Sequence, residues 1–335
     1  MPWKRRSAAI CVLVTYQMLV TNLGFAHPVA GPHAGAMTDY QHPIEFGLSL
    51  DPTADRIGET RHLARAADDS GLEYLAVQDH VYQPGHLDAL TMITHLATQT
   101  ERISFLTDVA DLQLRPPAML AKAGASLSVL TGGRVALGVG GGPSADAVAA
   151  MGGPRRGGAE TITYTAEGLQ IMRRALAGET VRHLGEQHTV EGYQGGPVPP
   201  RPVPLWLGGQ RPRMLRVAGR HADGWISPLN IYVPPDEVPA RQRIIDDAAR
   251  AAGRAPADIR RIYNVIGAIG PQGGGTGLVG DVQLWVDTLT HWAVDLGFDT
   301  FIFWPIMSPR AQLRAFADRV VPAVREHVRE IREQR

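Results

Sequence analysis

The stretch GLEYLAVQDH, residues 71–80, shows the pattern that decides the fold. It contains a strand-like run at 73–77, rich in apolar residues, and then turns polar at Gln78, Asp79 and His80. The chain contains eight such strand-like runs, at 44–50, 73–77, 103–107, 134–139, 204–207, 224–226, 262–269 and 300–304.

The segments between these runs have apolar residues at helical spacing. One example is the set Met119, Ala123, Leu127 and Leu130. Each predicted strand is therefore followed by a predicted helix. Eight such units fit an α/β fold of the (β/α)8 TIM-barrel type better than an open doubly wound sheet, which has about five or six strands.

Two segments interrupt this alternation. The first, 178–203, is an insertion between strands four and five, where 180–183 and 187–190 predict a small hairpin that turns at Gly185. The second, 270–280, contains six glycines and one proline and predicts a mobile loop after strand seven. We assign both to connections from strand to helix and expect them to be lids or substrate walls.

The composition excludes several classes of protein. The 335 residues carry 33 basic and 33 acidic groups, so the zero net charge gives no basis for nucleic-acid binding. Cys11 is the only cysteine, which excludes an intramolecular disulfide and a cysteine-based zinc site. An HExxH motif, a carboxylate cluster at ligand spacing and a G-x-S-x-G elbow are all missing, so we expect no metal site and no serine hydrolase.

Residues 1–36 differ from the rest of the chain. Three basic residues at 4–6 precede an apolar stretch of about 13 residues, as in an export signal, and this is too short for a membrane span of roughly 20. The alternative is a start codon placed too far upstream of Met37. We expect a leader over 1–36, a barrel domain over 40–330 and a cytoplasmic protein, or an exported one if the signal is genuine.

Asp79 and His80 are the candidate catalytic residues. Both follow a predicted strand, which puts them at the mouth of a barrel. An imidazole exchanges a proton near neutral pH, and an adjacent carboxylate would hold it or a bound ring.

Two glycine runs are candidate binding segments. Gly140, Gly141 and Gly142 end a predicted strand in bare backbone, which allows a flat ring or an anion to approach closely. The run also fits a loose dinucleotide fingerprint, but a helix follows it instead of a strand ending in an acidic residue. Gly208 and Gly209 precede a predicted helix, where amide groups would face a phosphate.

Six segments together resemble the bacterial luciferase-like family of F420- or FMN-dependent oxidoreductases. The matching pieces are residues 71–80, 102–109, 117–123, 131–140, 204–209 and 221–225. They keep the family's order from residue 44 to about 327. The resemblance implies a barrel that holds F420 or FMN at the carboxyl ends of its strands, with the ring against strands two to four.

The resemblance also implies roles for single residues. A non-proline cis peptide that backs the ring would lie at Asp108-Val109, and Thr107 precedes it in the cofactor-binding segment. His80 matches the histidine that the F420 branch places beside the reactive ring. Pro143 stands where the sugar-phosphate dehydrogenases of the family have a glutamate, which argues against that substrate.

We therefore expect an oxidoreductase that uses F420, or FMN as the alternative, for hydride transfer to a small organic substrate or for its monooxygenation. One alternative is a barrel that binds the flavin or deazaflavin without turnover, and another is a metal-dependent barrel hydrolase. The expected partners are the small-molecule substrate and a second copy in a homodimer, with no nucleic acid and no membrane.

Overall fold

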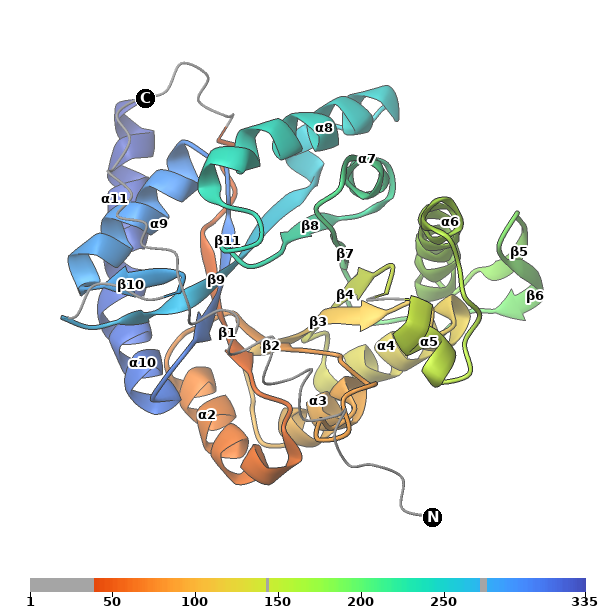
Figure 1. Ribbon diagram of the computed structural model, residues 1–335, viewed down its shortest axis with the longest axis horizontal. Helices are drawn as coiled ribbons and strands as arrows, with labels where there is room; N and C mark the ends of the chain where they lie inside the picture. Colours follow the sequence, from red (N-terminus) through yellow and green to blue (C-terminus); the bar gives the residue numbers. More distant parts are fainter. Residues whose placement is uncertain (1–38, 143–144, 272–275) are drawn as a thin grey trace, which may run out of the picture.

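A closed barrel of eight parallel strands forms the centre of the structure (Figure 1). β8 pairs with β9, which closes the sheet, so the predicted (β/α)8 barrel is confirmed. In order around the barrel the strands are β1 (Glu45–Leu50), β2 (Tyr74–Val77), β3 (Ser104–Asp111), β4 (Val135–Gly140), β7 (Leu205–Gly208), β8 (Gly224–Ser227), β9 (Arg260–Ile269) and β11 (Thr300–Pro305).

This computed structural model describes residues 39–142, 145–271 and 276–335. The predicted leader over 1–36 lies outside the described residues, as does the centre of the predicted glycine-rich loop. The end of that loop forms a short strand, β10 (Leu278–Gly280), which pairs with β9. Over the described ranges, no helix is long and apolar enough to cross a membrane.

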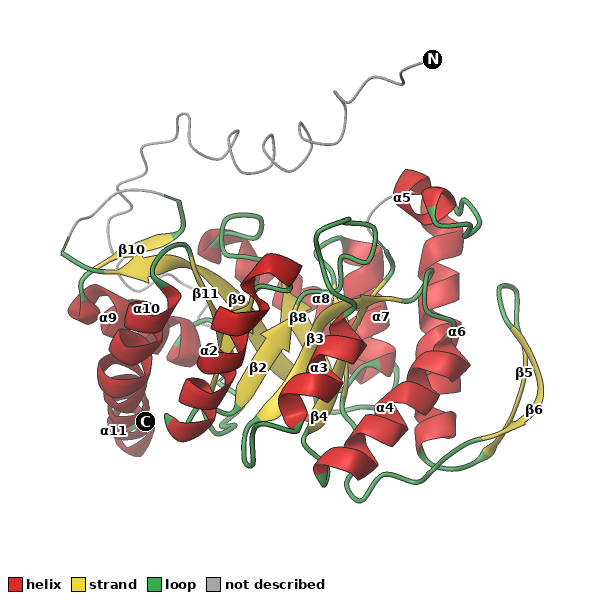
Figure 2. Cartoon of the chain, turned by 90° about the horizontal axis from the view of Figure 1, so that it is seen from below, coloured by secondary structure: helices red, strands yellow, loops and turns green. Residues whose placement is uncertain are grey.

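Helices surround the barrel and return the chain from the carboxyl end of one strand to the start of the next (Figure 2). They are α2 (Ile57–Asp69), α3 (Ala89–Ala97), α4 (Pro117–Thr131), α5 (Ala145–Ala150), α6 (Gly158–Leu176), α7 (Pro212–His221), α8 (Val238–Ala251), α9 (Val282–Val294), α10 (Pro309–Ala315) and α11 (Val321–Gln334). Asp88 caps the start of α3 by accepting a hydrogen bond from the Thr91 amide at 2.8 Å.

The inside of the barrel is filled by alternate strand residues. Side chains that point inward form one apolar cluster, made of Ala76, Leu106, Ala136, Trp206, Ile226, Ile262 and Ile302. The residues between them point outward and join the larger core under the helices. The cluster fills the barrel below the carboxyl ends of the strands, which form its mouth.

α4 buries only part of the apolar set whose spacing predicted a helix. Met119 and Leu130 are 65% and 74% exposed. Small residues face the barrel instead, and a β-carbon on Gly124 would lie only 2.5 Å from Leu137 Cδ1 of β4. The helix packs so close to the strand that only glycine fits at this position.

The insertion between strands four and five is a hairpin, as predicted, with antiparallel strands β5 (Thr180–Leu184) and β6 (Thr189–Gln194). The prediction that this hairpin lies at the active-site face is wrong. The hairpin follows α6 and precedes β7, so it lies on a connection from helix to strand (Figure 2). The Glu167 carboxylate of α6 accepts three hydrogen bonds from backbone amides of its turn, at 2.8–3.1 Å. These bonds hold the turn against α6.

Replacing Gly124 by Val should lower the free energy of unfolding by about 1–3 kcal/mol, because the new methyl groups overlap the buried Leu137 side chain. Gly58→Val in α2 is the matched control, since a β-carbon there meets nothing within 4 Å. Urea denaturation measures both variants. Equal stability of the two would contradict the close approach of α4 to β4.

Candidate active site

The predicted site residues lie at the carboxyl ends of four consecutive barrel strands. Asp79 and His80 follow β2, Asp108 and Val109 belong to β3, and the two glycine runs end β4 and β7. Because all eight strands are parallel, these ends meet at one side of the barrel mouth. The fold thus brings together segments that are more than a hundred residues apart in the chain.

The Asp108-Val109 peptide bond is cis, as predicted. At this point the pairing of β3 with β4 shifts register between Thr107 and Ala110. Val109 packs against the apolar cluster inside the barrel. The strand therefore places Val109 on the inner wall of the mouth.

The side chain of Val109 leaves little room for a β-carbon at two of the glycines. A β-carbon on Gly140 would lie 2.8 Å from Val109 Cγ2, and one on Gly208 would lie 3.1 Å from Val109 Cγ1. At Gly141 and Gly142 the same space is taken by side chains of α6, α7 and the segment after β3. Both glycine runs lack side chains because other protein atoms occupy the places where their β-carbons would lie. The sequence instead indicated that this space would be left for a bound ring.

Asp108 gives the mouth a polar inner surface. Asn264 Nδ2 on β9 donates a hydrogen bond to Asp108 Oδ1 at 3.2 Å. Trp304 Nε1 on β11 donates in turn to Asn264 Oδ1, also at 3.2 Å. Asn264 and Trp304 follow Ile262 and Ile302 at strand spacing, so this polar layer lies directly above the apolar cluster.

Asp79 does not act as the partner of His80. Both of its oxygens accept hydrogen bonds from Arg115, from Nε at 2.6 Å and from Nη2 at 2.7 Å. The Asp79 side chain is fully buried, and Arg115 Nη2 also donates to Asp88 at the start of α3. Arg115 therefore ties the segment after β3 to the end of β2, and it fixes the loop that carries His80.

His80 lies among other rings at the mouth. Its ring centroid is 5.6 Å from that of Tyr82 and 6.1 Å from that of His86. Burial lowers the pKa of His80 and the charge of His86 lowers it further, while Asp79 raises it. A lowered pKa leaves the imidazole neutral at pH 7, where it offers one hydrogen-bond donor and one acceptor.

Two residues that were predicted to bind the cofactor, Thr107 and Gly209, form hydrogen bonds within the protein instead. Thr107 is fully buried, and its hydroxyl donates to the Gly138 carbonyl at 2.7 Å. The Gly209 amide donates to the Ile226 carbonyl, and the Gly209 carbonyl accepts from Trp225 Nε1 at 2.7 Å. Any phosphate near this turn would therefore meet the amides of the first turn of α7, with Arg211 and Arg213 beside them.

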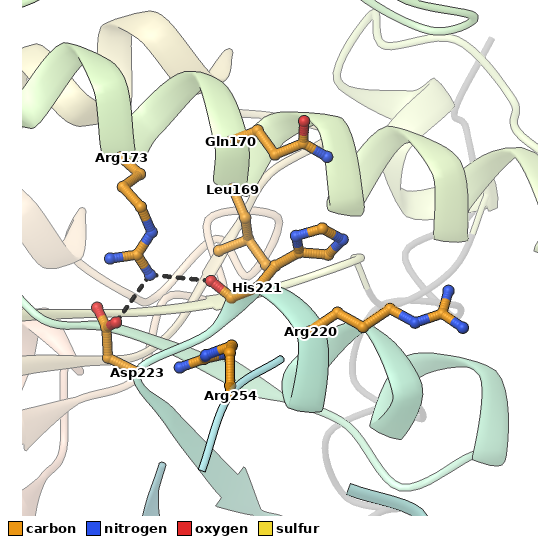
Figure 3. A pocket seen from close by; sticks show the side chains of 7 residues that line it. All are labelled: Leu169, Gln170, Arg173, Arg220, His221, Asp223 and Arg254. Carbon is orange, nitrogen blue, oxygen red and sulfur yellow. Dashed lines mark hydrogen bonds and ion pairs between the residues drawn. The ribbon is translucent and has the colours of Figure 1, made fainter. Parts of the chain in front are cut away.

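Two cavities, of about 380 and 400 Å³, lie between α6 and α7. Figure 3 shows the first, which is lined by Leu169, Gln170, Arg173, Arg220, His221, Asp223 and Arg254. Arg173 donates to the His221 carbonyl at 2.9 Å, and Arg254 donates to the Ala222 carbonyl at 2.7 Å. These arginines satisfy carbonyls at the end of α7, at the opposite end of the barrel from the mouth.

Hydride transfer at the mouth would need a bound cofactor. Its described side chains offer a neutral imidazole, a buried carboxyl and an amide, and none of them accepts hydride. No group of three or more His, Cys, Asp or Glu side chains that could hold a metal ion occurs in the part of the chain that the structure describes. The residue Pro143, which bears on the substrate, lies outside the described residues.

Comparison with known proteins gives consistent findings. A family model described as luciferase-like monooxygenase matches residues 33–272. A 5,10-methylenetetrahydromethanopterin reductase of Methanolobus tindarius is 32% identical over 221 residues, which are 64% of this chain and 63% of the relative. An F420-dependent glucose-6-phosphate dehydrogenase of Rhodococcus erythropolis is 29% identical over 236 residues, 66% of this chain and 67% of the relative.

A solved structure shows the same fold. An F420-dependent secondary alcohol dehydrogenase in complex with an F420-acetone adduct superimposes with a TM-score of 0.76. The match has 17% sequence identity and covers 84% of this chain and 99% of the other. The two curated relatives are matched over about two thirds of their length.

Replacing Arg115 by Met should lower the free energy of unfolding by about 3–5 kcal/mol, because it leaves the Asp79 carboxylate buried without its partner. The double variant Arg115→Met/Asp79→Leu should recover most of the loss, since no charge is then buried. Chemical denaturation measures both.

Arg56→Met provides the control, because Arg56 pairs with Asp51 on the surface and should contribute less than about 1 kcal/mol. A loss for Arg115→Met no larger than this control would show that the ion pair does not hold the loop.

Proposed function

Because the chain belongs to the luciferase-like monooxygenase family, we propose that it is an oxidoreductase that uses F420, with FMN as the alternative. Its reaction is hydride transfer to a small organic substrate, or monooxygenation of that substrate. The observation that carries the proposal is the position of Val109, which packs on the apolar cluster and forms the inner wall of the mouth. F420 is favoured because relatives in sequence and in structure are named as F420-dependent.

The residues of the mouth fit such a cofactor. Val109 offers an apolar surface for a flat ring, and Asp108 has one buried oxygen with no hydrogen-bond partner among the described residues. The first turn of α7 would hold the phosphate end, since the amides of Arg213 and Met214 and the nearby arginines attract an anion, although Pro212 offers no amide N–H. A bound F420 or FMN supplies the atom that gives or takes hydride.

The protein's own residues then have separate tasks. His80, neutral at pH 7, would give or take the proton that accompanies hydride transfer. Arg115 and Asp79 act as positioning residues, because their buried ion pair fixes the segment that carries His80. The apolar cluster beneath the mouth keeps water from entering from below.

Two further parts of the proposal concern assembly and location. We propose a homodimer, which the exposed apolar side chains of Met119, Val129 and Leu130 on α4 support. We also propose that the protein works in the cytoplasm, because a cofactor of this kind has to be reduced again after each turnover. Light scattering and fractionation of the native host test these two parts.

Titration of the purified protein with F420 and with FMN, followed by absorbance, tests the cofactor assignment. Binding of F420 in preference to FMN is expected. Failure of both cofactors to bind would overturn the proposed function. A bound cofactor that no substrate oxidises or reduces, over a panel of alcohols, ketones and aldehydes, would favour the non-catalytic alternative.

Replacing His80 by Ala should reduce turnover by roughly 10²- to 10⁴-fold while cofactor affinity stays close to that of the wild type. His95→Ala is the control, because His95 lies on the exposed side of α3 and accepts a hydrogen bond from Arg61 at 2.8 Å. Stopped-flow kinetics with saturating cofactor measure the effect. Equal turnover of the two variants would remove His80 from the proton transfer.

A further inference from the structure

The carboxyl group of Asp108 lies inside the barrel. Its hydrogen bond to Asn264 joins β3 to β9, and three strands, β2, β1 and β11, separate these two in the sheet. A bond between such strands has to cross the interior. Asp108 therefore faces the mouth from its centre and does not point into the wall.

The second oxygen of this carboxyl is also buried. Asp108 is 7% exposed, and its Oδ2 accepts no hydrogen bond from any described residue. An ionised carboxylate buried with a single neutral partner is unfavourable, because the amide replaces only part of its hydration. A protonated carboxyl is less costly, and its O–H needs an acceptor.

The surroundings of Asp108 contain little charge. Its hydrogen-bond partner is Asn264 on β9, which in turn accepts from Trp304 on β11, and neither of these side chains titrates. Burial raises the pKa of Asp108 to about 6, and the hydrogen bond from Asn264 lowers it by less.

The other titratable groups of the mouth are linked to one another and not to Asp108. Asp111, on the same strand, accepts a bond from the Gln113 amide and is influenced by Asp79 and Arg115. The pKa of His80 depends on burial, on His86 and on Asp79. Asp108 is therefore an acid that changes its charge near pH 6 largely on its own.

We infer that Asp108 faces the ring of the bound cofactor and, when protonated, donates a hydrogen bond to it, which favours the reduced ring over the oxidised one. The inference rests on the proposed function. Reduction increases the electron density on the carbonyl oxygens of a flavin or deazaflavin ring, which makes them better acceptors. An ionised Asp108 would repel the same atoms.

The protonation state of Asp108 sets how pH changes the preference for the reduced cofactor. Below pH 6 Asp108 is protonated and donates to the ring, so the reduced cofactor binds more tightly relative to the oxidised one. Above pH 6 the carboxylate disfavours the reduced ring. By linkage, binding of the reduced cofactor in turn raises the pKa of Asp108.

The test measures dissociation constants for oxidised and dithionite-reduced F420, and for FMN in parallel, between pH 5 and pH 8 under anaerobic conditions. The proteins are the wild type, Asp108→Asn, and the control Asp69→Asn at an exposed position of α2. An asparagine keeps a neutral donor at every pH. The ring's own ionisation is common to all three proteins, so a difference between them reports on Asp108.

For each protein we compare the affinity for the reduced ring with the affinity for the oxidised ring. Between pH 5 and pH 8 this ratio should fall by about tenfold to a hundredfold more in the wild type and in Asp69→Asn than in Asp108→Asn. Parallel profiles for all three proteins would overturn the inference and leave the proposed function standing. Failure of the wild type to bind either cofactor would overturn the proposed function itself. Thermal unfolding of Asp108→Asn confirms that the variant is folded.

Discussion

The shift of register in β3 between Thr107 and Ala110 determines what the mouth of the barrel contains. Regular alternation would bring only one of two neighbouring residues inward. At this shift the Asp108 carboxyl reaches Asn264 across the interior while Val109 packs on the apolar cluster. One apolar wall and one polar centre therefore come from consecutive residues, and the bare backbone of Gly140 and Gly208 leaves Val109 the space it needs.

The fold was largely predictable because its signal is local. Each strand is a short apolar run, and its periodicity differs from that of the helix that follows. The prediction failed where local pattern does not carry the information. α4 is apolar on more than one side, so its helical spacing does not show that Met119 and Leu130 are exposed while the small residue Gly124 lies against the barrel.

The site was predictable only in part, for the same reason. The end of a strand identifies His80 and the family resemblance identifies Asp108, but the groups that set their chemistry come from elsewhere in the chain. Arg115 binds a carboxylate 36 residues before it, and Asn264 binds one 156 residues before it. No spacing rule links such pairs, because closure of the barrel alone brings them together. The adjacent Asp79 was therefore assigned to His80, whereas the structure pairs it with Arg115.

The central claim is that the inner wall formed by Val109 receives the ring of a flavin or deazaflavin. A crystal structure of the protein with oxidised F420 bound tests it most directly. The account predicts the ring against Val109, with the phosphate end at the first turn of α7. A ring bound at the cavities between α6 and α7, or one separated from Val109 by other side chains, would contradict it.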